Sequence, residues 1–224
     1  MSVSLRDRAG PWTLEDLAEL GDDGQGYEIV DGLLLVSPPE MLFNTRLVHR
    51  LAQQLARQAP VPLEALHELY VRLGTDARRP DVAVIRGDAP VTRHQLGVEA
   101  QHVELIVEVV SPSSRKTDRF FTPVEYAAAG IPAYWRVETE PEVVVHVYRL
   151  VGDRYEQAQE VRGVESVEVP FPMVLDVPAL VPPYAPGLTG WSGPACEPTA
   201  VGGRRAPGVR WSLKPPAVRR PVRN

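Results

Sequence analysis

Two acidic residues stand in apolar stretches that have the composition of β-strands. Asp81 opens the run RPDVAVIRG (79–87), and Glu108 lies within HVELIVEVVS (102–111), on the same strand face as Ile106. An ionised carboxylate in an apolar strand costs free energy unless a cation compensates it. Two such acids on neighbouring strands would suit Mg²⁺, which prefers one or two carboxylates together with water and phosphate oxygens.

The same two acids have a purely structural alternative. Asp81 would then cap the start of its strand, and Glu108 would pair with a buried arginine. For either acid alone this is the commoner situation in proteins, because buried charges are generally paired. The occurrence of both acids in this order, one opening an apolar run and one within the next, weakens this alternative.

Several further elements must position these strands. Asp31-Gly32 in YEIVDGLLLVS predicts a hairpin turn. Residues 41–59 carry leucines at helical spacing and predict a helix, as do Thr13 and the residues after it. A helix is also expected over 118–129, where Pro123 would kink or delay it. Strands are predicted at 63–74, 79–87, 102–111, 133–138, 142–150, 154–159 and 164–170.

This order predicts an α/β (α+β) protein with a mixed β-sheet flanked by helices and a C-terminal antiparallel meander. Residues 171–183 are apolar and are expected to cap the core. We divide the chain into a flexible arm (1–12), one folded domain (13–183) and a disordered tail rich in Pro, Gly and Arg (184–224).

Composition excludes several classes of protein. The single cysteine, Cys196, rules out an intrachain disulfide and fits a reducing compartment. The first residues have no apolar core typical of a signal peptide, and no apolar run is long enough to span a bilayer. We therefore expect a cytoplasmic protein without a membrane partner.

The formal net charge of −5 is unevenly distributed. Residues 185–224 carry +6, and the preceding residues carry −11. An acidic body argues against a broad DNA-binding surface, although a basic tail would act as an electrostatic tether. Arginines near the two acids are expected to form a local basic rim: Arg72, Arg78, Arg79, Arg115 and Arg119.

The chain resembles the Uma-two (Uma2) family of restriction endonucleases, a branch of the PD-(D/E)XK nuclease superfamily. The resemblance covers roughly residues 12–183. It rests on four stretches: YEIVDGLLLVSPP (27–39), RPDVAVI (79–85), LIVEVVSPSSRKTDR (105–119) and EYAAAGIPAYWRVE (125–138).

The resemblance implies a restriction-endonuclease-like core and metal-dependent hydrolysis of DNA phosphodiester bonds. Asp81 and Glu108 would match the two metal-binding acids, with Mg²⁺ (or Mn²⁺) as cofactor and the backbone carbonyl of Val109 as a further ligand. Glu28 is a weaker candidate for an additional acid that some members use. Related enzymes often act as homodimers, so a homodimer is an open expectation.

The chain departs from the family at the catalytic lysine. The family pattern D-R-x-x-K-x-x-x-Y begins at Asp118, and its lysine position is Thr122, which has no positive charge. Lys116, the one lysine outside the basic tail, is the candidate to replace it, with Arg119 as a weaker one. A solvated loop lysine is the alternative for Lys116, and an arginine is a poor proton acceptor.

Three functions remain open from the sequence. The first is an Mg²⁺-dependent DNA endonuclease, which the Asp81 and Glu108 pair favours. The second is a catalytically weakened nucleic-acid-binding or regulatory protein of the same fold, which Thr122 favours. The third is a protein-interaction role for the fold, with the tail serving to target it.

Overall fold

The computed structural model describes residues 10–20, 25–37, 39–110 and 122–182, and all of them belong to one compact unit, Met1–Trp191. The helices are α1 (Leu14–Leu17), α2 (Leu42–Gln58), α3 (Thr122–Ala128) and α4 (Val177–Leu180), with one 3-10 turn, η1 (Ala100–His102). The strands are β1 (Gly26–Val30), β2 (Leu33–Ser37), β3 (Leu63–Leu66), β4 (Tyr70–Leu73), β5 (Asp76–Arg78), β6 (Val82–Arg86), β7 (Gly97–Glu99), β8 (Val103–Val109), β9 (Ala133–Glu138), β10 (Val144–Val151), β11 (Arg154–Val161), β12 (Val164–Val167) and β13 (Met173–Asp176).

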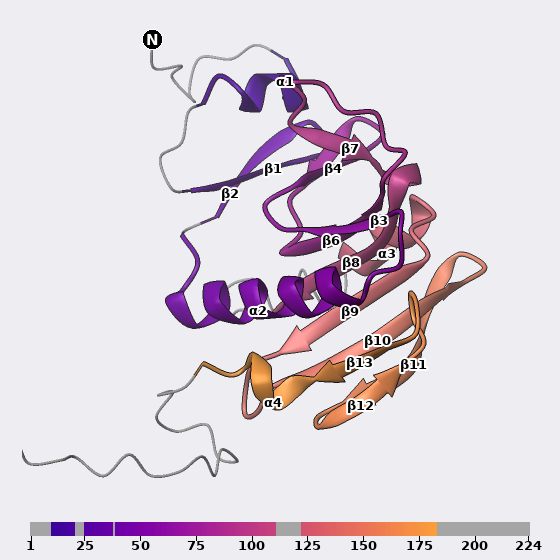
Figure 1. Cartoon of the computed structure of the whole chain (residues 1–224). Coiled ribbons are helices and arrows are strands. Elements are labelled where there is room, and N and C mark those ends of the chain that lie inside the picture. The colour runs from indigo at the N-terminus through magenta and orange to yellow at the C-terminus, as the bar shows by residue number, and fades with distance from the viewer. Residues whose placement is uncertain (1–9, 21–24, 38, 111–121, 183–224) are drawn as a thin grey trace, which may run out of the picture. The chain divides into compact units, whose positions relative to one another are not determined.

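These strands form two principal sheets and one small one, which confirms the predicted mixed α/β class (Figure 1). The six-stranded sheet has the order β11-β10-β9-β8-β6-β3, in which only β8 and β9 run parallel. The five-stranded sheet has the order β2-β1-β5-β4-β7, and β12 pairs with β13 alone. The sequence pattern predicts a single mixed sheet and does not indicate this division into two.

The six-stranded sheet carries an apolar core on each face. Leu47, Leu51 and Leu55 of α2 are fully buried and belong to the same cluster as alternate residues of β6, β8 and β9. Figure 1 shows α2 running along this sheet. The opposite face packs Ile106 of β8 against Tyr126 of α3. The central strands are therefore apolar on both faces, as the dense run in 102–111 predicted.

The first hairpin forms as its turn residues predicted. Asp31 and Gly32 both adopt positive φ angles, 51° and 73°, which suit a two-residue turn between twisted antiparallel strands. The paired strands β1 and β2 place Glu28 opposite Leu35. The hairpin thereby fixes the position of Glu28 at the middle of β1.

Two predicted elements differ from the structure. Residues 63–74 form two strands rather than one, because Glu68 adopts a left-handed φ of 59° and breaks the run. The resulting strands β3 and β4 join different sheets. The predicted meander holds for β9, β10 and β11, whereas β12 leaves it and pairs with β13.

The helix expected over 118–129 is described from Thr122 onward. Pro123 is the second described residue of α3. Whether it kinks or delays the helix depends on residues 118–121, which lie outside the described residues, so that expectation stays a prediction.

The predicted arm and tail fall almost entirely outside the described residues, so their disorder stays a prediction. Of the arm, Trp12 donates its backbone N–H to the carbonyl of Gly32 at 2.8 Å. Residues 171–182 cap the core as expected, since Leu175 and Leu180 are fully buried against α2 and the sheet. Among the described residues, no helix is both long and apolar enough to cross a lipid bilayer.

Candidate active site

Asp81 and Glu108 come together where β6 begins and β8 ends. In the antiparallel pair of these strands, Val82 lies opposite Val107, so Asp81 lies across from Glu108. Val82 and Val107 face the same core cluster, and side-chain alternation directs both acids to the other face. Asp81 Oδ2 accepts the backbone N–H of Val109 at 2.6 Å, which holds this carboxylate beside the end of β8.

Glu108 is held by a buried phenol. The hydroxyl of Tyr126 in α3 donates to Glu108 Oε1 at 2.9 Å, and Tyr126 is 0% exposed. Burial, together with the negative charges of Glu108 and Glu28, raises the pKa of Tyr126 well above its ordinary value. The phenol therefore stays protonated at neutral pH and remains a hydrogen-bond donor to the carboxylate.

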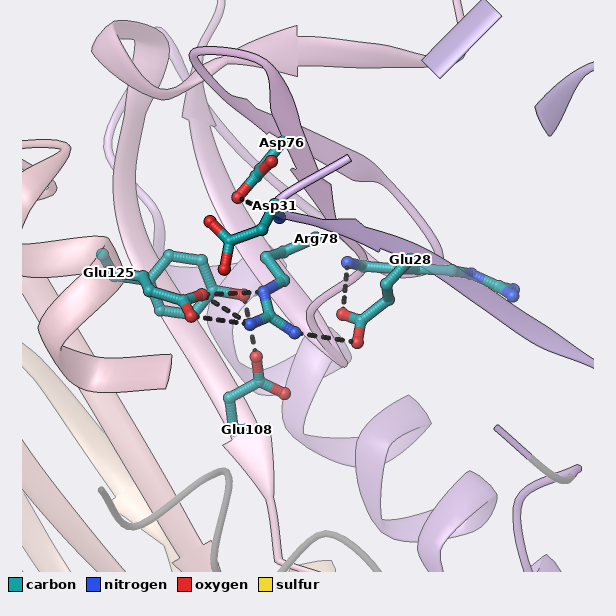
Figure 2. A network of polar contacts seen from close by, with 8 residues as sticks. Glu28, Asp31, Asp76, Arg78, Glu108 and Glu125 are labelled. Atoms are coloured by element: carbon teal, nitrogen blue, oxygen red, sulfur yellow. Dashed lines mark hydrogen bonds and ion pairs between the residues drawn. The ribbon is translucent and has the colours of Figure 1, made fainter. Parts of the chain in front are cut away.

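A buried arginine occupies the centre of the surrounding network (Figure 2). Arg78 is 3% exposed and donates from Nε and Nη2 to the two oxygens of Glu125, each at 2.8 Å. Its third nitrogen, Nη1, donates to Glu28 Oε2 at 3.2 Å. Burial disfavours the charged form of Arg78, but the charges of Glu28 and Glu125 outweigh it and raise its pKa.

The network joins segments from both principal sheets. Glu28 belongs to β1 and Arg78 to β5, in the five-stranded sheet, whereas Glu108 belongs to β8 in the six-stranded sheet. Glu28 Oε1 also accepts the backbone N–H of Arg79 at 3.0 Å. Helix α3 supplies neighbouring residues Glu125 and Tyr126, which connect Arg78 with Glu108 (Figure 2).

Three of the site residues predicted from the sequence lie close together in the structure. Asp81, Glu108 and Val109 lie together at the end of β8, and Glu28 joins them through Arg78 and α3. Thr122 begins the described part of α3, one helical turn before Tyr126, and is 3% exposed. Lys116 and Arg119 lie outside the described residues, so their roles stay predictions.

The expected basic rim is wrong for Arg78 among its three described arginines. Arg78 is buried between two carboxylates instead of lying at a surface. Arg72 pairs with Glu15 at 2.6 Å and with Glu99 at 3.2 Å, so acids already neutralise it. Arg79 is as exposed as Arg72, at 30% against 29%, and pairs with exposed Glu68 at 3.6 Å. Arg78 is buried because it belongs to β5, a strand that the sequence pattern did not predict.

Arg78, Glu125 and the hydroxyl of Tyr126 are parts of this network that the sequence pattern did not reveal. Tyr126 is fully buried, and its bond to Glu108 is not indicated by the sequence pattern. The available signal was the spacing in α3. Thr122 and Tyr126 are four residues apart, so they share a helix face, and both are buried.

The donor set at this position is small and made of oxygen. Within the described ranges, no group of three or more His, Cys, Asp or Glu side chains is arranged to hold a metal ion. What the structure brings together is a pair of carboxylates from neighbouring strands beside a backbone peptide, namely Asp81, Glu108 and Val109. Oxygen donors of this kind match hard divalent cations that retain several waters.

The structure is a mixed α/β fold in which helix α3 and the start of β6 bring polar groups to the end of β8. The chain belongs to the Uma2 family, described as "Putative restriction endonuclease", because the family's sequence model matches residues 14–178. A solved structure with a similar fold is titled "a putative nuclease belonging to DUF820" from Anabaena variabilis ATCC 29413. It is 18% identical, has a TM-score of 0.60, and the match covers 76% of this chain and 97% of that one. A search of curated proteins finds no match.

Proposed function

We propose that this protein is a divalent-metal-dependent endonuclease that hydrolyses phosphodiester bonds of DNA. The observation that carries the proposal is the pairing of Asp81 and Glu108, with the Asp81 carboxylate bonded to the peptide N–H of Val109 at 2.6 Å. Membership in the Uma2 family supports the same chemistry. The expectations of a homodimer and of a cytoplasmic location stay predictions.

The residues fit Mg²⁺ or Mn²⁺ as cofactor. Asp81, Glu108 and the carbonyl of Val109 would hold it, and the remaining ligands would be water and a phosphate oxygen. Such a cation polarises the scissile phosphate and lowers the pKa of the attacking water. The chain itself orients the two carboxylates through the N–H of Val109 and the hydroxyl of Tyr126. Lys116 is the proposed source of an amine near the phosphate, with Arg119 as a second candidate.

The proposal is tested with the full chain and supercoiled plasmid in Mg²⁺, Mn²⁺ or EDTA. Wild-type protein should nick or linearise the plasmid only with metal, and the double variant Asp81→Ala/Glu108→Ala should not. Glu156→Ala is the control, since Glu156 is a half-exposed acid on β11 that pairs with Arg154. Equal cleavage by all three proteins would mean that another site, or a contaminant, does the cutting.

A second candidate function is binding of nucleic acid without efficient cleavage. The observation that favours it is Thr122, whose hydroxyl occupies the family's lysine position and supplies no charge. In that case the wild-type chain shifts DNA in a mobility assay, with metal present, yet leaves the plasmid intact. The two candidate functions share the same site and differ in whether the plasmid is cleaved.

Replacing Thr122 by lysine is expected to increase cleavage about a hundredfold, the lower range for a positioned proton-transfer group. The new side chain would start on the α3 face that carries Tyr126, one helical turn before that residue, whose hydroxyl bonds Glu108. The rate constant for plasmid nicking measures the effect. Thr122→Met is the control, because it adds comparable length without charge. A gain shared by the methionine variant, or no gain for lysine, would contradict the argument.

A further inference from the structure

We infer that Tyr126 is a positioning residue that fixes the carboxylate of Glu108 for metal binding, and that Arg78 fixes Tyr126 through Glu125. The inference rests on the proposed function, because it assigns roles around the same pair of acids. Tyr126 is the tyrosine that ends the D-R-x-x-K-x-x-x-Y pattern, to which no role was given, and Arg78 lies outside that pattern.

The phenol of Tyr126 has little freedom to move. Tyr126 is fully buried in the core beneath the six-stranded sheet, and its ring packs 6.3 Å from the ring of Tyr134. A ring enclosed in this way keeps its hydroxyl in one place. That hydroxyl donates to Oε1 of Glu108, so it restricts the carboxylate of a side chain that otherwise has several rotamers.

Helix α3, which carries this phenol, is positioned by tertiary contacts. The described part of α3 spans Thr122–Ala128, which is too short to be stable by its own hydrogen bonds. Its position must come from tertiary contacts. Glu125, the residue directly before Tyr126, receives two parallel hydrogen bonds from Arg78, a geometry that sets both distance and orientation.

Arg78 itself is not placed to bind substrate. Its Nε, Nη1 and Nη2 atoms each bond to a carboxylate of Glu28 or Glu125, and its side chain is only 4% exposed. A phosphate would have to displace these bonds and enter a buried site. The guanidinium therefore acts on the metal site only through the residues it holds.

Residues that orient metal ligands have a recognisable energetic signature. Removing such a residue lowers metal affinity or activity about 10- to 100-fold while the ligands themselves remain. A residue that only contributed to packing would change thermal stability and leave metal affinity unaltered. Metal affinity measured on the free protein therefore separates the two roles.

The test compares Tyr126→Phe with Tyr155→Phe in the full chain. Tyr155 is the matched control, because its hydroxyl donates to the backbone carbonyl of Ile131 at 2.8 Å and its ring also packs on Tyr134. Mn²⁺ affinity is measured by electron paramagnetic resonance without DNA, and thermal unfolding is followed in parallel. We expect about tenfold weaker Mn²⁺ binding for Tyr126→Phe, and wild-type affinity for Tyr155→Phe.

Arg78→Lys extends the test to the second residue. Lysine keeps the charge but loses the two parallel bonds to Glu125, so Mn²⁺ binding should weaken in the same direction. Wild-type Mn²⁺ affinity in folded Tyr126→Phe would overturn the inference, as would the absence of Mn²⁺ binding by the wild-type chain. Failure of the proposed function looks different. The wild-type chain would then bind Mn²⁺, lose that binding in Asp81→Ala and in part in Tyr126→Phe, and still not cleave DNA.

Discussion

Replacing Asp81 by asparagine, or Glu108 by glutamine, is expected to lower metal-dependent DNA cleavage about a thousandfold or more. Each amide keeps the size of the carboxylate and loses its charge. A metal contributes several kcal/mol of transition-state stabilisation, and about 1.4 kcal/mol corresponds to a factor of ten in rate. Loss of one of two charged ligands should remove most of that contribution. Single-turnover cleavage of plasmid at saturating enzyme measures it.

The amide variants should fold normally, because the structure gives each one a replacement bond. In Asp81→Asn the amide oxygen can accept the N–H of Val109, as the carboxylate does, and in Glu108→Gln it can accept from Tyr126. Glu104→Gln is the control, since Glu104 lies on the same strand as Glu108 and its carboxylate pairs with Arg86 at 3.5 Å. Cleavage retained in either site variant, with the fold intact, would remove that acid from the mechanism.

Arg78→Met is expected to lower the free energy of unfolding by about 3 kcal/mol. Removing one partner of a buried ion pair costs about 3–5 kcal/mol, because the remaining charge is left uncompensated. Here two carboxylates, Glu28 and Glu125, would lose their shared cation. Both keep some contact with water, with side chains 22% and 33% exposed, so the lower end of the range applies. Urea unfolding followed by circular dichroism measures the change.

A surface arginine provides the comparison for this stability effect. Arg162 pairs with Glu160 at 2.8 Å and also with Glu142, but its side chain is 51% exposed. Exposed pairs of this kind contribute about 0–1 kcal/mol, so Arg162→Met should change little. Adding Glu125→Gln to Arg78→Met should recover part of the loss, since it removes one of the uncompensated charges. A loss below about 1 kcal/mol in Arg78→Met would contradict the role of Arg78 as a buried structural cation.

The elements with strong periodicity were predicted well from the sequence. The leucine spacing of 41–59 gave α2 to within a residue at each end, and the run AYWRVE matches β9 as it stands. The short strands were not predicted. β5 and β7 have three residues each, too few for alternation to register, and the turn at Glu68 depends on a left-handed backbone that glutamate seldom adopts.

In the candidate site, too, some residues could be predicted from the sequence and others could not. Asp81 and Glu108 stand out in the sequence because an acid in an apolar stretch is unusual, and the structure places Asp81 directly before β6 and Glu108 in β8, next to the opposed pair Val82 and Val107. The buried role of Arg78 could not be found in this way. Its partners Glu28 and Glu125 are 50 and 47 residues away along the chain, so only the tertiary fold reveals the contact. The roles of Lys116 and Arg119 stay predictions.

The bond between Glu28 and Arg78 limits how much of the N-terminal part can be removed without disturbing the site. Glu28 comes from the first hairpin, whereas the paired acids stand at the end of β8 in the other sheet. A fragment that kept the six-stranded sheet and omitted the hairpin would leave Arg78 without Glu28 and shift the charge balance around α3. The hairpin is thus an integral part of the proposed catalytic unit, and shortening the chain from the N-terminal side would have to stop before Glu28 to keep that unit intact.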